Sequence, residues 1–341
     1  MKIGALLLMS LVVGGCATRL LNGDRPPDLA SGDMADYSAP DLAAPPDLSP
    51  PPDLSLADLS PPPDLSPPPD LTPPKPVCGT SFSASGTPVA SVSTSGAQEA
   101  LLGASASGDS LLLLRASFAE CVSSPDTRLT IGDAATSGTT NYVSQDLTTA
   151  MRIDEFSEAE ATMTLSADGL TIIGVANLQF RQVSRPVVGA VNFGLPIAGP
   201  FTQINASLGG VTSLEWPLLS ADGLAFYYHV SAGSGVGTYE SLRASTNDPF
   251  PAGTLMPAAV QQFGAVTGIS SDRLTLFVTA NFGTSIMTRP TLADAFTLAP
   301  IQMAPGSAYR VVPIDDCNLL VGTCEPGGCA NEDICLWSAT P

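Results

Sequence analysis

The stretch LSADGLTIIG (165–174) decides the fold of this chain. It joins a Ser-x-Asp turn to an apolar run, and the chain repeats that pattern at intervals of 44 to 59 residues. The turns consist of Ser107 and Asp109, Ser166 and Asp168 with Gly169, Ser220 and Asp222 with Gly223, Ser270 and Asp272, and a fifth that ends in Asp316 without the serine. Repeats of this length with strand patterns and no amphipathic helices predict an all-β fold, a β-propeller with one blade per repeat.

The residue types of these turns predict how each turn closes. Serine hydroxyls and aspartate carboxylates bind backbone N–H groups one to three residues ahead, and glycine tolerates a positive φ. Gly169 and Gly223 fit that role, whereas Ser110, Arg273 and Cys317 stand at the same place in the other repeats. We therefore expect those three turns to close with another geometry.

The apolar runs are continuous rather than alternating, which predicts strands covered on both faces by neighbouring blades. They read SLLLLRAS (110–117), GLTIIGVA (169–176), GLAFYYHV (223–230), RLTLFVTA (273–280) and CNLLVGTC (317–324). Inside the long first unit, we expect RLTIGDAA (128–135) to pair with SLLLLRAS, and a hidden sixth blade is the alternative.

A second element fixes the phase of the repeat. Arg243, Asp248 and Phe250 recur as Arg289, Asp294 and Phe296 with identical spacing. Five four-stranded blades then fill residues 82–341, with boundaries near Phe82, Phe156, Phe201, Phe250 and Phe296. We expect N-terminal residues of the domain to complete the C-terminal blade, because that closure removes exposed sheet edges.

Three segments carry a family resemblance: LSADGLTIIG (165–174), LSADGLAFYY (219–228) and LRASTNDPF (242–250). They resemble the WD-like propeller repeats of TolB-type periplasmic proteins and of many bacterial envelope lipoproteins. The resemblance covers roughly residues 82–341 and implies a fold rather than an activity. Arg273 in place of glycine and the missing serine before Asp316 depart from the pattern.

The N-terminus predicts export and lipid anchoring. Residues 1–15 form a signal peptide whose apolar stretch is too short to span a membrane. Gly14 and Gly15 before Cys16 resemble the lipobox of bacterial lipoproteins, so we expect Cys16 to carry the lipid that binds the membrane. Ala17 resembles the sorting signal for the outer membrane. A plain secretory signal is the alternative.

Residues 16–77 predict a disordered tether. Pro-Asp-Leu recurs at Pro27, Pro40, Pro46, Pro52, Pro63 and Pro69. Such a segment cannot bury a core, and an extended polyproline conformation reaches on the order of 150 to 190 Å. The alternative is a recognition ligand for a partner with aromatic grooves.

The charge of the chain and its cysteines limit the kinds of partner and the cellular compartment that we expect. The tether carries ten aspartates, and residues 78–341 carry 22 acidic residues against nine arginines, which argues against nucleic acid as a partner. Six cysteines of the exported domain predict disulfides rather than zinc. We expect Cys78 to pair with Cys121 and the other four to pair within the last blade: Cys317, Cys324, Cys329 and Cys335.

Catalytic patterns are scarce in the sequence. His229 is the only histidine, and we expect it inside the fold or on a blade face. The main carboxylate cluster comprises Asp154, Glu155, Glu158 and Glu160. It predicts a solvated loop, with glycoside hydrolysis or calcium binding as alternatives.

Two classes of function follow. The first is a non-enzymatic module anchored in the bacterial cell envelope that binds an envelope protein or a cell-wall glycan where the blade loops converge. The second is a secreted carbohydrate-active enzyme that uses acidic residues at the propeller axis. Neither a metal nor a cofactor is predicted.

Overall fold

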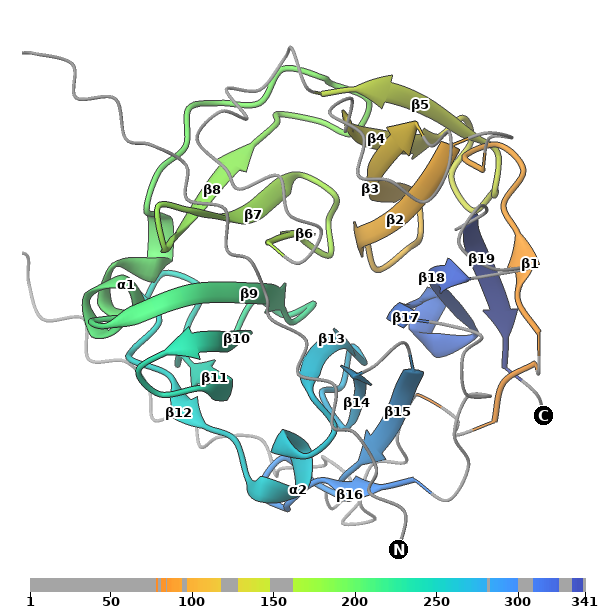
Figure 1. Cartoon of the computed structure of the whole chain (residues 1–341). Coiled ribbons are helices and arrows are strands. Elements are labelled where there is room, and N and C mark those ends of the chain that lie inside the picture. The colour runs from red at the N-terminus through yellow and green to blue at the C-terminus, as the bar shows by residue number, and fades with distance from the viewer. Residues whose placement is uncertain are drawn as a thin grey trace, which may run out of the picture. The chain divides into compact units, whose positions relative to one another are not determined.

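The computed structural model describes nine segments of the chain, all within the unit formed by residues 69–341. They are residues 78, 81–83, 85–93, 97–117, 128–147, 162–280, 283–299, 309–324 and 333–339. These residues form five antiparallel sheets around a common axis, which confirms the predicted β-propeller (Figure 1). Several predictions concern residues outside these segments: the signal peptide, Cys16, the tether, Cys121, Cys329 and the cluster of Asp154, Glu155, Glu158 and Glu160.

The blades follow one another along the chain. Blade 1 contains β2 (Ala97–Ala104), β3 (Ser110–Ser117), β4 (Arg128–Ala134) and β5 (Tyr142–Asp146). Blade 2 contains β6 (Met163–Leu165), β7 (Thr171–Ala176) and β8 (Gln179–Ser184), and blade 3 contains β9 (Val211–Leu219), β10 (Ala225–Gly233), β11 (Gly237–Leu242) and β12 (Thr254–Leu255). Blade 4 contains β13 (Ala265–Ile269), β14 (Thr275–Ala280), β15 (Gly283–Thr288) and β16 (Thr297–Leu298). Blade 5 contains β17 (Tyr309–Ile314), β18 (Leu319–Cys324), β19 (Asp333–Ser338) and β1 (Thr87–Pro88).

Two details refine the predicted strand count. RLTIGDAA forms β4 and pairs with β3 as expected, so within the described segments the long first unit supplies one blade. Blade 2 has three strands instead of four, and a single bridge between Gln182 and Ile197 marks the place of the fourth.

Short helices lie in the connections between strands. The connections between blades contain η2 (Gly199–Phe201), α1 (Thr202–Ser207) and α2 (Ala258–Gln261), whereas η3 (Asp315–Cys317) lies between β17 and β18 of blade 5. Within the described segments, no helix has the length and apolar character needed to cross a membrane.

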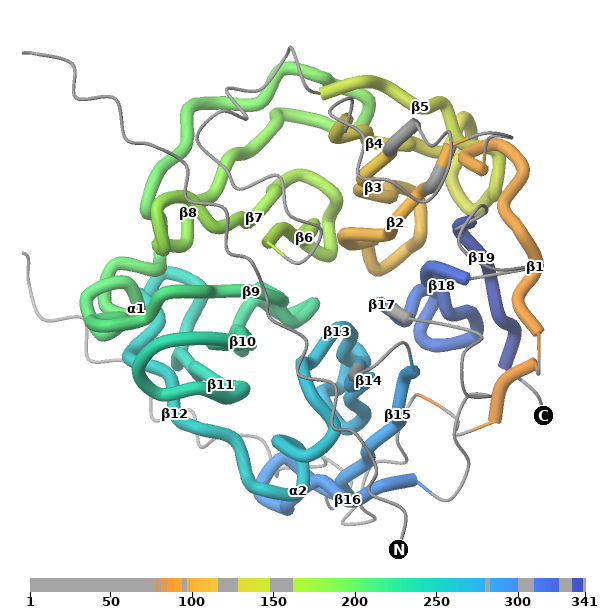
Figure 2. The backbone as a smooth tube through the Cα atoms, in the orientation of Figure 1, coloured from red at the N-terminus to blue at the C-terminus, as the bar shows by residue number. Residues whose placement is uncertain are grey.

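The ring closes through the N-terminal part of the domain, as predicted. β1 lies beside β19 although the two are far apart in the sequence (Figure 2). Thr87 pairs with Leu336, Pro88 pairs with Cys335, and a further bridge joins Phe82 to Ala339. The outermost strand of blade 5 therefore comes from the start of the domain, which removes an open edge.

The core lies between adjacent blades, because the second strand of each blade contributes side chains to both neighbours. In β10, Phe226 and Tyr228 pack with Ile173 of blade 2, whereas Tyr227 packs with Leu276 of blade 4. All five side chains are at most 2 % exposed. Burial of each such side chain stabilises the fold by about 1.5–3 kcal/mol, so the interfaces between sheets hold the ring together.

The Ser-x-Asp turns are built from a repeated set of hydrogen bonds. The hydroxyl of Ser166 donates to Asp168 at 2.5 Å and accepts the N–H of Thr171 at 2.8 Å. The carboxylate of Asp168 also accepts the N–H of Leu170 at 2.9 Å. The turns at Ser220 with Asp222 and at Ser270 with Asp272 repeat these bonds. The serine thus binds five residues ahead, farther than the sequence predicted.

The turn at Arg273 lacks glycine and keeps the same geometry, contrary to expectation, whereas the turn at Cys317 closes differently, as expected. Arg273 has φ 59°, close to the 71° of Gly169, and its ion pair with Asp222 holds it in the left-handed region. In the last turn Asp315, Asp316 and Cys317 are all left-handed and form the 3-10 helix η3 (Asp315–Cys317), and Cys317 forms a disulfide. Left-handed residues other than glycine persist only where surrounding contacts determine the conformation.

The first turn is displaced by two residues from its predicted position. Ser105, rather than Ser107, accepts the N–H of Ser110 at 2.9 Å, and Gly108 with φ 76° takes the place of Gly169. Ser107 accepts the N–H of Asp109 at 3.3 Å and so stands where Asp168 stands in blade 2. Asp109 instead accepts bonds from the hydroxyl of Ser137 and the N–H of Gly138, so the assignment of Ser107 and Asp109 to the repeat was wrong.

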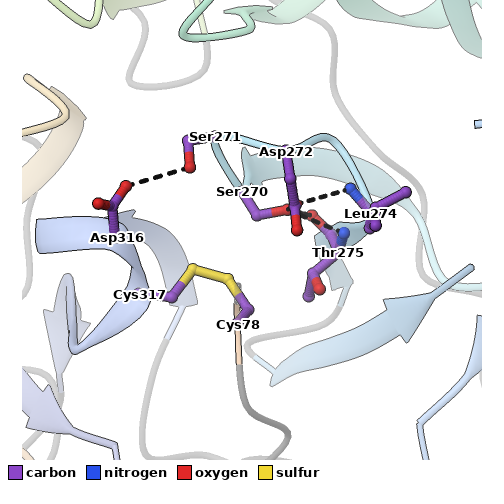
Figure 3. The surroundings of a disulfide bond; sticks show 8 residues. All are labelled: Cys78, Ser270, Ser271, Asp272, Leu274, Thr275, Asp316 and Cys317. Carbon is purple, nitrogen blue, oxygen red and sulfur yellow. Dashed lines mark hydrogen bonds between the residues drawn. A yellow bond between two sulfur atoms is a disulfide. The ribbon is translucent and has the colours of Figure 1, made fainter. Parts of the chain in front are cut away.

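The predicted pairing of Cys78 with Cys121 was also wrong. Cys78 forms a disulfide with Cys317, beside the turn of blade 4 (Figure 3). The expected pairing of Cys317 within the last blade was therefore wrong as well, whereas Cys324 pairs with Cys335 there, as expected. The reason for the difference is the closure of the ring, which brings the start of the domain to blade 5.

Candidate functional site

The inner strands of four blades bulge at corresponding places in their pairing. The pairing shifts between Leu101 and Gly103 in β2 and between Val266 and Gly268 in β13. It also shifts at residues 216–217 of β9 and 310–311 of β17. A bulge leaves a residue unpaired and re-aims its side chain, so these strands can turn side chains toward the axis.

Residues from all five blades line one small cavity. Each blade contributes one member of what we call the axial plug, which consists of Leu102, Met163, Trp216, Thr267 and Arg310. The cavity left between them has a volume of about 10 Å³, roughly the space of one water molecule. This cavity is therefore too small for a ligand.

Arg310 is the charged member of the plug. Its side chain reaches across the axis, where the guanidinium carbon lies 4.4 Å from the centre of the Trp216 ring. Nη1 donates to the carbonyl of Leu101 at 2.9 Å, and the residue is only 4 % exposed. Trp216 and Arg310 both have φ 54°, a conformation that costs about 1–3 kcal/mol at a residue other than glycine.

A polar cluster lies on β9 and β10, on the surface of blade 3 that faces blade 4. The hydroxyl of Ser231 donates to Glu215 at 2.5 Å, and Ser213 donates to the same carboxylate oxygen at 2.9 Å. His229 pairs with Glu215 across the two strands and is half-buried. The only histidine therefore lies on a blade face, in agreement with the prediction.

The surroundings of His229 set its tautomer. Its Nδ1 lies 2.9 Å from the hydroxyl of Thr238, and that hydroxyl donates to the carbonyl of Gly264 at 2.8 Å. Because the Thr238 proton is already used, Nδ1 carries the proton and Nε2 is the acceptor. Burial lowers the pKa of His229 below its usual value, and the negative charge of Glu215 opposes that shift.

A polar groove opens between blades 2 and 3, beside the turn of Ser220 and Asp222. Its volume is about 540 Å³, and its polar lining comes from Gln182, Arg243, Thr246, Asn247 and Asp248. We call it the Arg243 groove. Groups of this kind bind polar ligands through hydrogen bonds, and the size is within the range of small-molecule sites.

Arg243 is held rigidly at this groove. Its Nε donates to the carbonyl of Gly223 at 2.7 Å, and Nη1 donates to the carbonyl of Asp248 at 3.0 Å. The guanidinium carbon lies 4.3 Å from the centre of the Phe250 ring. Burial lowers the pKa of Arg243, and the carboxylates of Asp248 and Asp222 oppose that effect.

A second pocket of about 240 Å³ lies against blade 3. The stacked rings of Tyr228 and Tyr239, with centres 5.2 Å apart, contribute to its lining together with Ser207 and Ser234. Burial raises the pKa of Tyr228 to about 12, and the charge of Tyr239 adds to the shift, so its hydroxyl stays protonated at neutral pH.

The structure gives the turn aspartates a structural role. Asp168, Asp222 and Asp272 accept bonds inside their own turns, and Asp316 accepts the hydroxyl of Ser271 from the neighbouring blade at 3.2 Å. Within the described segments, no group of three or more histidine, cysteine, aspartate or glutamate side chains is arranged to hold a metal.

Sequence reasoning missed Arg185, Trp216 and Arg310. A signal for Arg185 was present, since it follows Asp168 at the same interval as Arg289 follows Asp272. Arg310 and Trp216 carry no such signal, because nothing in a single inner strand reveals where its bulge lies.

Comparisons with solved structures return proteins of low similarity. A crystal structure of TolB from Acinetobacter baumannii is 12 % identical, with a TM-score of 0.38, over 69 % of this chain and 53 % of that one. A GH74 enzyme from Niastella koreensis is 14 % identical, with a TM-score of 0.35, over 72 % and 37 %. The β-propeller domain of the Trilobed protease from Pyrococcus furiosus is 10 % identical, with a TM-score of 0.28, over 72 % and 70 %.

The alignment thus spans about half of the TolB chain and about a third of the GH74 chain. No protein-family model and no curated protein matches the sequence. The solved structures include enzymes and a protein named only as TolB.

Proposed function

We propose that this protein is a lipid-anchored β-propeller of the bacterial cell envelope that binds an envelope component without chemical turnover. The sequence before the propeller supports the anchoring, with Gly14 and Gly15 before Cys16 and an extended tether over residues 16–77. The disulfides of Cys78 with Cys317 and Cys324 with Cys335 support folding outside the reducing cytosol. Outer-membrane attachment, suggested by Ala17, is part of the proposal.

The recessed surfaces of the blades are the observation that supports the binding role. They are larger than the cavity of about 10 Å³ inside the axial plug, so we expect ligands to bind there. Two such recesses are the Arg243 groove and the pocket beside Tyr228. Their hydroxyl, amide and aromatic groups suit a hydroxyl-rich ligand, so we favour an envelope glycan over a protein partner.

Anchoring is tested by following the lipid and the membrane fraction. Cells that express the full chain and the Cys16→Ala variant are labelled with a radioactive fatty acid and then fractionated. We expect label and membrane association for the natural sequence, and neither for the variant. Unlabelled natural protein, or a variant that stays equally bound to membranes, would contradict the anchor.

Binding is tested by capture from isolated envelopes. The full chain is cross-linked to envelope material, and the recovered glycan and protein are identified against a control with the Cys16→Ala variant added in soluble form. Both are expected to recover the same component. Recovery of nothing reproducible, or steady chemical conversion of the captured component by purified protein, would refute a binding role.

A further inference from the structure

Three blades use an arginine at the same position after their third strand. Each arginine folds back over its own blade and donates from Nε to the carbonyl of the left-handed residue in the turn, at 2.7 to 3.1 Å. Each also lies near the ring of a phenylalanine. The sets are Arg185 with Gly169 and Phe193, Arg243 with Gly223 and Phe250, and Arg289 with Arg273 and Phe296.

Between blades 1 and 2, the terminal nitrogens of this arginine bind a carboxylate. Nη1 and Nη2 of Arg185 each donate to one oxygen of Asp133 at 2.7 Å. Nη2 also donates to the hydroxyl of Ser110 at 3.0 Å, and the Arg185 side chain is fully buried. This arginine position therefore has the geometry to hold a carboxylate with two parallel bonds.

Arg185 and Arg243 match in more than position. Nη1 of each donates to the carbonyl of the residue five places ahead, which is Ala190 in one case and Asp248 in the other. The two guanidinium groups are thus oriented alike within their blades. What differs is the neighbouring blade that each one faces.

Between blades 2 and 3, the place of Asp133 is taken by a neutral residue. Asp133 pairs with Ser110 near the end of β4, the third strand of blade 1. In blade 2, Ser184 pairs with Thr171 at the end of β8, so Ser184 has the position that matches Asp133. Ser184 is exposed, and its hydroxyl lies 2.9 Å from that of Thr171, the counterpart of Ser110. Within the described segments, Arg243 forms no ion pair at 4.0 Å or less.

The missing fourth strand of blade 2 leaves this place open. Only Ile197 pairs with Gln182, and the chain then turns at Gly199 with φ 51°, where a Cβ would meet the Gln182 side chain at 2.6 Å. The result is the Arg243 groove of about 540 Å³. Gln182, Thr246, Asn247 and the acidic Asp248 line it alongside the guanidinium.

We infer that the Arg243 groove binds the carboxylate of an acidic sugar, in the place that Asp133 occupies one interface earlier. The hydroxyls of the sugar find donors and acceptors in Gln182, Thr246 and Asn247. The inference rests on the proposed glycan-binding function and adds the class of sugar. The negative charges of Asp222 and Asp248 near the same arginine oppose the binding of a carboxylate. Salt screens the attraction between the guanidinium and the sugar carboxylate, so binding is expected to weaken as the salt concentration rises.

The test uses the full chain and calorimetric titration with tri-galacturonic acid as the probe. The methyl-esterified trimer removes the charge, and an acetylated dipeptide with a free carboxyl end supplies the same group without a sugar. We expect binding of the acid trimer, and binding weaker by about tenfold or more for the ester and the dipeptide.

The decisive variant is Ser184→Asp, which places a carboxylate at the position of blade 2 that matches Asp133. We expect this carboxylate to bind Arg243 and so to compete with the ligand. It is expected to weaken binding of the acid trimer by about tenfold or more while leaving the melting temperature unchanged or higher. Thr288→Asp adds the same charge at the matching place of blade 4 and is expected to leave binding within about twofold.

Several results would overturn the inference. They are equal binding of the acid and ester trimers, equal binding of the dipeptide, full binding by Ser184→Asp, or an equal loss in Thr288→Asp. None of them would affect the lipid anchor or the capture of another envelope component, so failure here is distinct from failure of the proposed function.

Discussion

The guanidinium of Arg310 lies over the ring of Trp216 across the propeller axis, with 4.4 Å between the guanidinium carbon and the ring centre. These residues belong to blades 5 and 3, which are not neighbours in the ring. Arg310 also donates to the carbonyl of Leu101 in blade 1. One side chain therefore connects three blades that otherwise meet only through their adjacent sheets.

We expect Trp216→Ala to lower the free energy of unfolding by about 3 kcal/mol, because it removes a large plug side chain and the contact with Arg310. Denaturant unfolding of Trp216→Ala, Arg310→Ala and the double variant measures the coupling between the two residues. A coupling of about 1–2 kcal/mol is expected for a cation and ring shielded from water. Additive effects would show that the two residues stabilise the plug independently.

The ion pair of Arg185 with Asp133 predicts a large loss for Asp133→Asn. The substitution leaves the buried guanidinium without its counter-charge, and we expect the free energy of unfolding to fall by about 3–5 kcal/mol. Asp146→Asn is the matched control, because the contact of Asp146 with Arg128 is 3.6 Å long and both side chains are exposed. It should cost at most about 1 kcal/mol. Similar losses in the two variants would contradict the role given to burial.

The same pair predicts a pH dependence. Burial by itself would raise the pKa of Asp133, but hydrogen bonds from Arg185 and Ser110 and the charge of Arg185 hold it below its usual value. A depressed pKa stabilises the fold above the unfolded value of about 3.9, and this contribution is lost as pH falls through the folded value. The stability difference between the natural protein and Asp133→Asn should therefore be constant near neutral pH and shrink below about pH 4. A difference that grows in acid would refute the assignment.

Much of the ring was predictable because its strongest signals are local. The apolar runs became β3, β7, β10, β14 and β18, the second strands that lie between neighbouring blades. Closure by N-terminal residues was also predictable, since a ring with an open sheet edge is unfavourable. The first turn was misplaced because Ser107 and Asp109 copy the motif by chance, two residues after the serine that closes the turn.

The axis and the Arg243 groove could not be predicted, because they depend on relations between blades. The inward direction of Trp216 follows from a bulge in β9, and bulges leave no mark in a single strand. The groove lies between Gln182 of blade 2 and Arg243 of blade 3, a proximity that depends on how the two sheets are arranged. The pairing of Cys78 with Cys317 likewise depends on where the ring closes.

That disulfide should stabilise the domain more than the one inside blade 5. It joins residues 239 apart in the sequence, whereas Cys324 and Cys335 are 11 apart. Chain entropy predicts that replacing Cys78 and Cys317 by alanine costs about 5 kcal/mol, against about 3 kcal/mol for the other pair. Unfolding of the two double variants under the same conditions checks the order. The reverse order would show that the contacts of β1, rather than the disulfide, close the ring.

Adding a side chain at a left-handed glycine can cost stability through the backbone conformation and through crowding. Comparison of Gly138 with Gly169 distinguishes these two effects. Gly138 has φ 76° and no atom within 4 Å of an added Cβ, so Gly138→Ala is expected to cost about 1 kcal/mol through the backbone alone. Gly169 has φ 71°, and its Cβ would lie 2.9 Å from the hydroxyl oxygen of Ser110.

Gly169→Ala should therefore add crowding to the same backbone cost, for a total of about 2–4 kcal/mol. The crowding displaces Ser110, which also binds Asp133 and Arg185, so the variant should lose part of the interface between blades 1 and 2. The double variant with Gly169→Ala and Asp133→Asn tests this link. Its loss of unfolding free energy is expected to be smaller than the sum of the losses in the two single variants. Full additivity would show that the turn and the ion pair stabilise the ring separately.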